Sequence, residues 1–218
     1  MTEPTRVLHH YKVDLALHQL RDHGDAHPLL LLHGLGERTP DRLPGPVSAW
    51  PGPVWGLDFA GHGGSTIPRG GGYTAELLMG DADAAVAALG PLTVCGRGIG
   101  AYVALLIAGA RPNEVRGAVL ADGSGLAGGG TSPGSPVVIT PAEGSGRTPD
   151  PLALLELSRD VRPPDYALTY LRLAMQRSEL EAPVAVSAVV RPPWLAAVAD
   201  EPGVIECSVP EALARFAR

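Results

Sequence analysis

Short apolar runs alternate along this chain with segments of helical pattern, and this alternation most constrains its fold. The runs 28–33, 53–58 and 92–95 are mostly apolar, which is typical of strands buried on both faces. The segments 74–89 and 99–110 have the apolar pattern of helices. Strands that alternate with helices form mainly parallel sheets covered by helices on both sides. The sequence therefore predicts an α/β fold with a mostly parallel sheet of about eight strands.

The remaining elements complete a single predicted domain over residues 1–218. Alternating polarity in 13–18 predicts the second strand of an edge hairpin. The stretch 123–151 is rich in Gly and Pro, so 123–182 is expected to be a lid or excursion, with a short extended piece at 137–139. Further strands are expected at 115–122, 184–190 and 204–207, and further helices at 152–158, 166–177, 194–199 and 210–217.

Composition and charge exclude several classes of function. The net charge is −6 and the basic residues do not cluster, which argues against a nucleic-acid partner. No apolar run approaches the roughly 20 residues of a membrane span, and no signal peptide is visible, so a cytoplasmic location is expected. Cys95 and Cys207 do not make a disulfide framework. No ligand spacing for a metal is present, and no metal or cofactor is expected.

Three motifs in order carry a family resemblance. An apolar strand runs into His33 and Gly34, the turn 56–65 contains Asp58 and Gly-His-Gly, and 96–100 reads Gly-Arg-Gly-Ile-Gly before a helix. Together they resemble the α/β-hydrolase fold over residues 7–122, and 183–218 is similar by pattern only. A dinucleotide-binding site is disfavoured, since Ala101 stands where its third glycine belongs.

This resemblance implies a site at the end of the strand that precedes residue 98. In the family, two backbone N–H groups there hold the oxyanion, and the corresponding groups belong to Leu35 and Ile99. They are expected to remain able to hold a carbonyl or carboxylate oxygen of a small molecule. The candidate ligand-binding residues are His33, Gly34, Leu35, Arg97, Gly98 and Ile99.

The catalytic triad of the family is missing from this chain. The nucleophile position is Gly98, which has no side chain. No carboxylate follows the strand predicted at 184–190, where the family has its acid. The family's histidine comes after the nucleophile, but all seven histidines here lie within residues 1–62. A hydroxyl is a weak nucleophile without a positioned base, so ordinary serine-hydrolase chemistry is not expected.

The ionisable residues near the site have structural as well as functional interpretations. His33 and Asp122 are weak candidates for relocated catalytic groups, although a buried structural histidine and a loop-capping aspartate are favoured. Arg97 is expected to pair either with a ligand carboxylate or with an acid of the protein, which is Asp122 or a surface acid. Turn roles are expected for His62, Asp58 and Ser124, a buried strand position for Cys95 and an inert thiol for Cys207.

Three functions therefore remain open. The first is a non-hydrolytic protein that binds a small molecule or regulates through the vestigial cavity. The second is an esterase-like or lyase-like enzyme that uses His33 with Asp122 or Arg97. The third is a structural protein whose surface does the work, for instance as a homo-oligomer.

Overall fold

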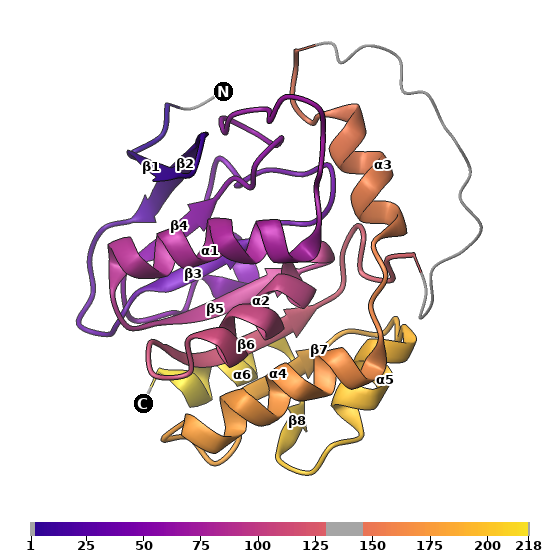
Figure 1. The fold of residues 1–218 in the computed structure, drawn as a ribbon. Coiled ribbons are helices and arrows are strands. Elements are labelled where there is room, and N and C mark those ends of the chain that lie inside the picture. The colour runs from indigo at the N-terminus through magenta and orange to yellow at the C-terminus, as the bar shows by residue number, and fades with distance from the viewer. Residues whose placement is uncertain (1–2, 130–145, 218) are drawn as a thin grey trace.

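A computed structural model describes residues 3–129 and 146–217 and contains one eight-stranded sheet (Figure 1). The strands are β1 (Arg6–His10), β2 (Val13–Arg21), β3 (Leu29–Leu32), β4 (Val54–Leu57), β5 (Leu92–Arg97), β6 (Val115–Ala121), β7 (Val184–Ser187) and β8 (Val204–Glu206). The α-helices are α1 (Ala75–Leu89), α2 (Ile99–Ala110), α3 (Pro151–Arg159), α4 (Pro164–Arg177), α5 (Pro193–Ala199) and α6 (Val209–Phe216).

The strand order is β1-β2-β4-β3-β5-β6-β7-β8. β1 and β2 form the antiparallel edge hairpin that the sequence predicts, and β2 also pairs antiparallel with β4. All other neighbouring strands are parallel. The prediction of a mostly parallel sheet of about eight strands with flanking helices is confirmed.

Alternate residues of each central strand enter two separate cores. Leu30 and Leu32 of β3 pack in the larger core with side chains from α1 to α5, whereas Leu29 packs in the smaller core with α6. Figure 1 shows α1, α2 and α4 on one face of the sheet and α6 on the other. The continuous apolar character of the strand sequences follows from this burial on both faces.

Local sequence signals define the two ends of α1 as predicted. The Thr74 side chain accepts a hydrogen bond from the N–H of Leu77 at the start of α1, and Gly90 ends that helix with a φ of 77°. α2 is buried along its length except for its last residue, Ala110. It begins directly after Gly98, which has φ 60° and ψ −126°.

The connection from β3 to β4 contains no α-helix. It crosses the α6 face of the sheet with a single 3₁₀ turn, η1 (Gly45–Val47), although parallel crossovers usually contain a helix. From β3 the chain moves outward to β4, and then returns past β3 to start β5. The strand order therefore reverses between β3 and β5, which is the position where open α/β sheets generally bind ligands.

Two predicted segments differ from the structure. β7 ends at Ser187 rather than at 190, because the N–H groups of Val189 and Val190 donate to the side chain of Asp122 instead of to a strand. Within the predicted excursion 123–182, the helices α3 and α4 are present, and residues 123–129 turn back over the end of the sheet. The extended piece predicted at 137–139 lies outside the described residues.

Candidate functional site

The turn between β5 and α2 is a sharp strand-to-helix turn in which Gly98 precedes the helix directly. Gly98 adopts a conformation that side chains rarely tolerate. A Cβ at this position would overlap the carbonyl oxygen of Ser124 and lie 2.7 Å from the carbonyl carbon of Gly123. Glycine is therefore required here by the neighbouring chain as well as by the backbone angles.

The two amides implied as oxyanion donors are already occupied by the protein itself. The N–H groups of Leu35 and Ile99 both donate to the carbonyl oxygen of Ser124, at 2.9 Å and 3.0 Å. Two converging N–H groups on one oxygen are the arrangement that an oxyanion site provides for a substrate. The expectation that these amides point into an open cavity is therefore wrong for this conformation, because residues 122–126, here called the capping segment, fill their place.

Hydrogen bonds at both ends hold the capping segment in place. The Asp122 carboxylate accepts from Val189 N–H at 2.6 Å and from Val190 N–H at 3.0 Å, which confirms its loop-capping role. Arg162 is 1% exposed and donates to the carbonyls of Gly125 and Leu126, at 2.5 Å and 2.7 Å. The Trp194 indole N–H also donates to the Leu126 carbonyl, at 2.9 Å. The segment is thus anchored to two other parts of the chain.

His33 uses both ring nitrogens within the protein. The N–H of Phe59 donates to its Nε2 at 3.1 Å, so Nδ1 carries the proton and donates to the Gly34 carbonyl at 2.7 Å. Burial, together with nearby His62, lowers the pKa of His33 to about 4. The side chain is thus neutral and its basic nitrogen is engaged, which favours the structural interpretation of His33.

The Gly-His-Gly turn is built around buried polar side chains. Burial alone would raise the pKa of Asp58, but hydrogen bonds from His18, Gly64 N–H and Thr39 N–H outweigh it and lower the pKa to about 2. His62 accepts from Gly36 N–H at 3.1 Å and is fully buried. Asp58 and His62 therefore stabilise loops, as predicted.

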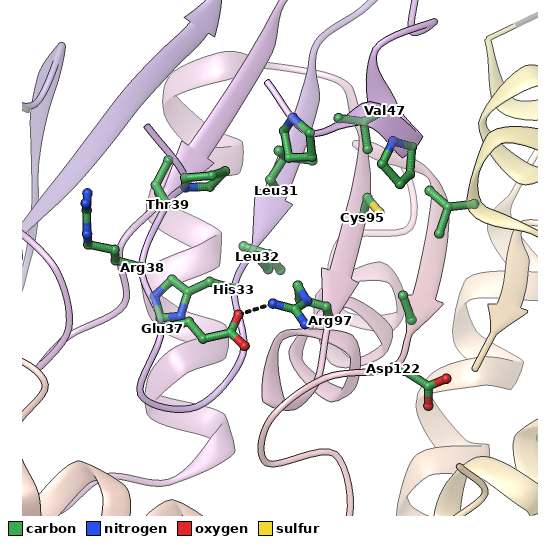
Figure 2. A pocket seen from close by; sticks show the side chains of 15 residues that line it. Leu31, Leu32, His33, Glu37, Arg38, Thr39, Val47, Cys95, Arg97 and Asp122 are labelled. Carbon is green, nitrogen blue, oxygen red and sulfur yellow. Dashed lines mark hydrogen bonds and ion pairs between the residues drawn. The ribbon is translucent and has the colours of Figure 1, made fainter. Parts of the chain in front are cut away.

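A cavity of about 340 Å³ lies on the α6 side of the sheet, at the carboxyl ends of β3, β5 and β6 (Figure 2). Its floor includes Leu31 and Cys95, which are paired across β3 and β5. Two residues after Cys95, Arg97 of β5 is paired with Ala121 of β6, and both also line the cavity. The remaining wall comes from the β3–β4 connection and from α6, and includes Pro40, Pro44, Pro46, Val47 and Val209.

One end of this cavity is polar because Glu37 and Arg97 meet there (Figure 2). Glu37 Oε2 accepts from Arg97 and from Gly34 N–H, and Oε1 accepts from the Ser124 hydroxyl at 3.1 Å. Arg97 is 54% exposed and Glu37 27% exposed. Arg97 therefore pairs with an acid of the protein, and that acid is Glu37. Glu37 also connects the cavity to the capping segment.

The two cysteines do not form a reactive pair. Both are free thiols, and burial raises the pKa of Cys95 to about 12 and also raises that of Cys207. Across the described ranges, no group of three or more His, Cys, Asp or Glu side chains is arranged to hold a metal. In the same part of the chain, no helix has the length and apolar character needed to cross a membrane.

The structure brings most of the predicted site residues together but gives them new partners. His33, Arg97 and Asp122 all line the cavity, whereas Leu35 and Ile99 lie under the capping segment. Sequence reasoning missed Glu37, and it also missed Arg162, a buried arginine outside every recognised motif. No motif signals either residue: Glu37 bonds to Gly34 N–H nearby, but its partners Arg97 and Ser124 and the partners Gly125 and Leu126 of Arg162 are far away in sequence.

Comparison with known proteins identifies the fold. No protein-family model and no curated protein sequence matches this chain. Among solved structures, Est1E from Butyrivibrio proteoclasticus with ferulic acid bound is similar with a TM-score of 0.63 at 12% identity, over 98% of this chain and all of that one. A hypothetical protein from Pseudomonas aeruginosa PAO1 gives a TM-score of 0.63 at 18% identity, over 98% and 99%.

A thioesterase domain from the curacin biosynthetic pathway is also similar, with a TM-score of 0.60 at 16% identity, covering 97% of this chain and 96% of that one. These structures cover nearly the whole chain and share one architecture. The chain therefore has the α/β-hydrolase fold, as its three motifs suggest.

Proposed function

We propose that this protein is a non-hydrolytic member of its fold that binds a small molecule beside the vestigial active site. The observation that carries the proposal is the position of the Ser124 carbonyl. It occupies both amides that would otherwise hold the oxygen of a substrate carbonyl. Without those donors and without a side chain at Gly98, neither attack on an ester nor stabilisation of the resulting oxyanion has a structural basis.

The alternative of an enzyme with relocated groups has weaker support. A general base must reach the proton it removes with a free lone pair. The one basic lone pair of His33 accepts from Phe59 N–H. Each oxygen of the Asp122 carboxylate accepts a backbone N–H, from Val189 or Val190, so the carboxylate is held in place as a loop cap. Arg97 has no basic lone pair at neutral pH and is paired with Glu37.

Binding of a small molecule is supported by the cavity that remains. Its volume of about 340 Å³ lies within the range of roughly 300–1,000 Å³ found for ligand pockets. It also lies where the strand order reverses, between β3 and β5, which is the usual ligand position in open α/β sheets. Both the size and the position of the cavity thus favour a ligand there.

Two measurements test the proposal together. Hydrolysis of p-nitrophenyl acetate should proceed at the background rate, and a fluorophosphonate probe should label no serine. The protein purified from cells should release a small molecule on denaturation, detected by mass spectrometry. Cys95→Phe, which places a ring in the cavity, should release none, whereas Cys207→Phe serves as the matched control because Cys207 does not line the cavity. Stoichiometric serine labelling, or equal release by both variants, would contradict the proposal.

A further inference from the structure

The size of the cavity restricts what it can hold. An engineered apolar cavity of about 150 Å³ in another protein binds benzene. The cavity here is about 340 Å³, slightly more than twice that volume. Its floor and walls are mostly apolar, formed by residues such as Leu31, Val47 and Val209. A molecule with the bulk of two fused rings therefore matches it.

The polar end of the cavity offers a hydrogen-bond donor and an acceptor side by side. The Arg97 guanidinium has five N–H groups, and one of its nitrogens donates a hydrogen bond to Glu37. Glu37 is a carboxylate, which only accepts. A hydroxyl group matches both, because it donates to the carboxylate and accepts from the guanidinium.

The charges around the cavity disfavour an anion. The charge of Arg97 is balanced by Glu37, and that of Arg38 by Asp41, at 2.7 Å. Asp122 adds a further carboxylate to the lining. A ligand carboxylate would therefore meet the unbalanced carboxylate of Asp122 and no unbalanced cation of the cavity lining, and like charges at short range oppose binding.

We propose that the cavity binds a neutral, mainly apolar molecule about the size of two fused rings, with a hydroxyl group at the Glu37–Arg97 pair. This inference rests on the proposed function, since it names the ligand class of the same cavity. The apolar part would lie over Leu31 and Cys95, beneath the η1 turn. The family resemblance implies a ligand with a carbonyl or carboxylate oxygen at the amides of Leu35 and Ile99, whereas the ligand proposed here has a hydroxyl group at the Glu37–Arg97 pair.

The test compares 2-naphthol with 2-naphthoate at pH 7, by isothermal titration calorimetry on the full chain. These probes have the same ring system and differ in the charge of the polar group. The wild type is expected to bind 2-naphthol at least tenfold more tightly than 2-naphthoate. Glu37→Gln removes one negative charge and should reduce this preference by about tenfold. Arg97→Gln should weaken 2-naphthol binding by about tenfold, because one hydrogen bond to a charged group is lost.

Cys95→Phe should abolish binding of 2-naphthol, and Cys207→Phe should leave it unchanged, with circular dichroism confirming that both variants fold. Equal or tighter binding of 2-naphthoate by the wild type would overturn the ligand class but leave small-molecule binding intact. If neither probe binds the wild type, the proposed ligand class is wrong, and release of a small molecule from the purified protein still decides the proposed function separately. If Cys95→Phe binds 2-naphthol normally, the cavity is not the binding site and the proposed function fails as well.

Discussion

Replacing Gly98 by serine is expected to destabilise the protein without making it an esterase. A Cβ at residue 98 would overlap the Ser124 carbonyl oxygen and lie 2.7 Å from the carbonyl carbon of Gly123. The capping segment must therefore move away from the amides of Leu35 and Ile99 before a serine can fit. The serine would then stand at the elbow with no histidine available to accept its proton.

The expected loss in the free energy of unfolding of Gly98→Ser follows from two local effects. A side chain forced into the conformation of Gly98 costs about 1–3 kcal/mol. Displacing the Ser124 carbonyl removes two hydrogen bonds, each worth about 0.5–1.5 kcal/mol. The free energy of unfolding should therefore fall by about 2–6 kcal/mol, a large share of the roughly 5–15 kcal/mol that is typical of native proteins. For a chain of this length, each kcal/mol lowers the Tm by about 2–4 °C.

Urea unfolding of Gly98→Ser and Gly90→Ser separates the two effects. Gly90 has φ 77° and ψ −161°, and a Cβ there would meet no atom within 4 Å. Gly90→Ser thus carries backbone strain but no collision and should lose only about 1–3 kcal/mol. If Gly98→Ser loses no more than Gly90→Ser, the capping segment does not hold the amides as described. A gain of several orders of magnitude in p-nitrophenyl acetate hydrolysis would reveal a base, and would refute the structural role of His33.

Three further predictions concern the groups that hold the site. Acidification from pH 6.5 towards 4 should lower the free energy of unfolding measured in urea, because His33, with a pKa of about 4, binds its proton only when unfolded. Burial raises the pKa of Asp81 to about 6, so the folded state gains a proton there and offsets part of that loss; Asp81→Asn should steepen the loss, and a pH-independent profile of Asp81→Asn would contradict the role of His33. Asp122→Ala should cost about 1–3 kcal/mol in urea unfolding, and Asp122→Asn, which keeps one acceptor, should cost less. Arg162→Met should cost about 2–5 kcal/mol by leaving buried carbonyls unpaired, and an unchanged urea midpoint would show that Arg162 does not anchor the capping segment.

Most of the fold could be predicted from local signals in the sequence. Apolar runs predict the central strands. At α1, Thr74 caps the start of the helix and Gly90 ends it. Burial of α2 follows from its apolar sequence, and the glycine motifs mark the turns after β3, β4 and β5. These features depend on residues close together in the chain, and periodicity and turn chemistry are properties of such neighbours.

The sequence by itself also determined that residue 98 is a glycine and that every histidine precedes it. Gly98 has no side chain that could act as a nucleophile, and no histidine follows it in the chain. Both facts hold for any fold. Only the tertiary structure decided what fills the vacant site. The Ser124 carbonyl reaches the amides of Leu35 and Ile99, and Arg162 supports it from a different part of the chain.

Those contacts involve backbone groups that every residue carries, so no residue type signals them in advance. The cavity between β3, β5 and α6 is likewise walled in part by the β3–β4 connection, which contains one 3₁₀ turn and no α-helix. An empty volume is defined by the side chains that surround it from several elements, and only their packing in three dimensions determines it.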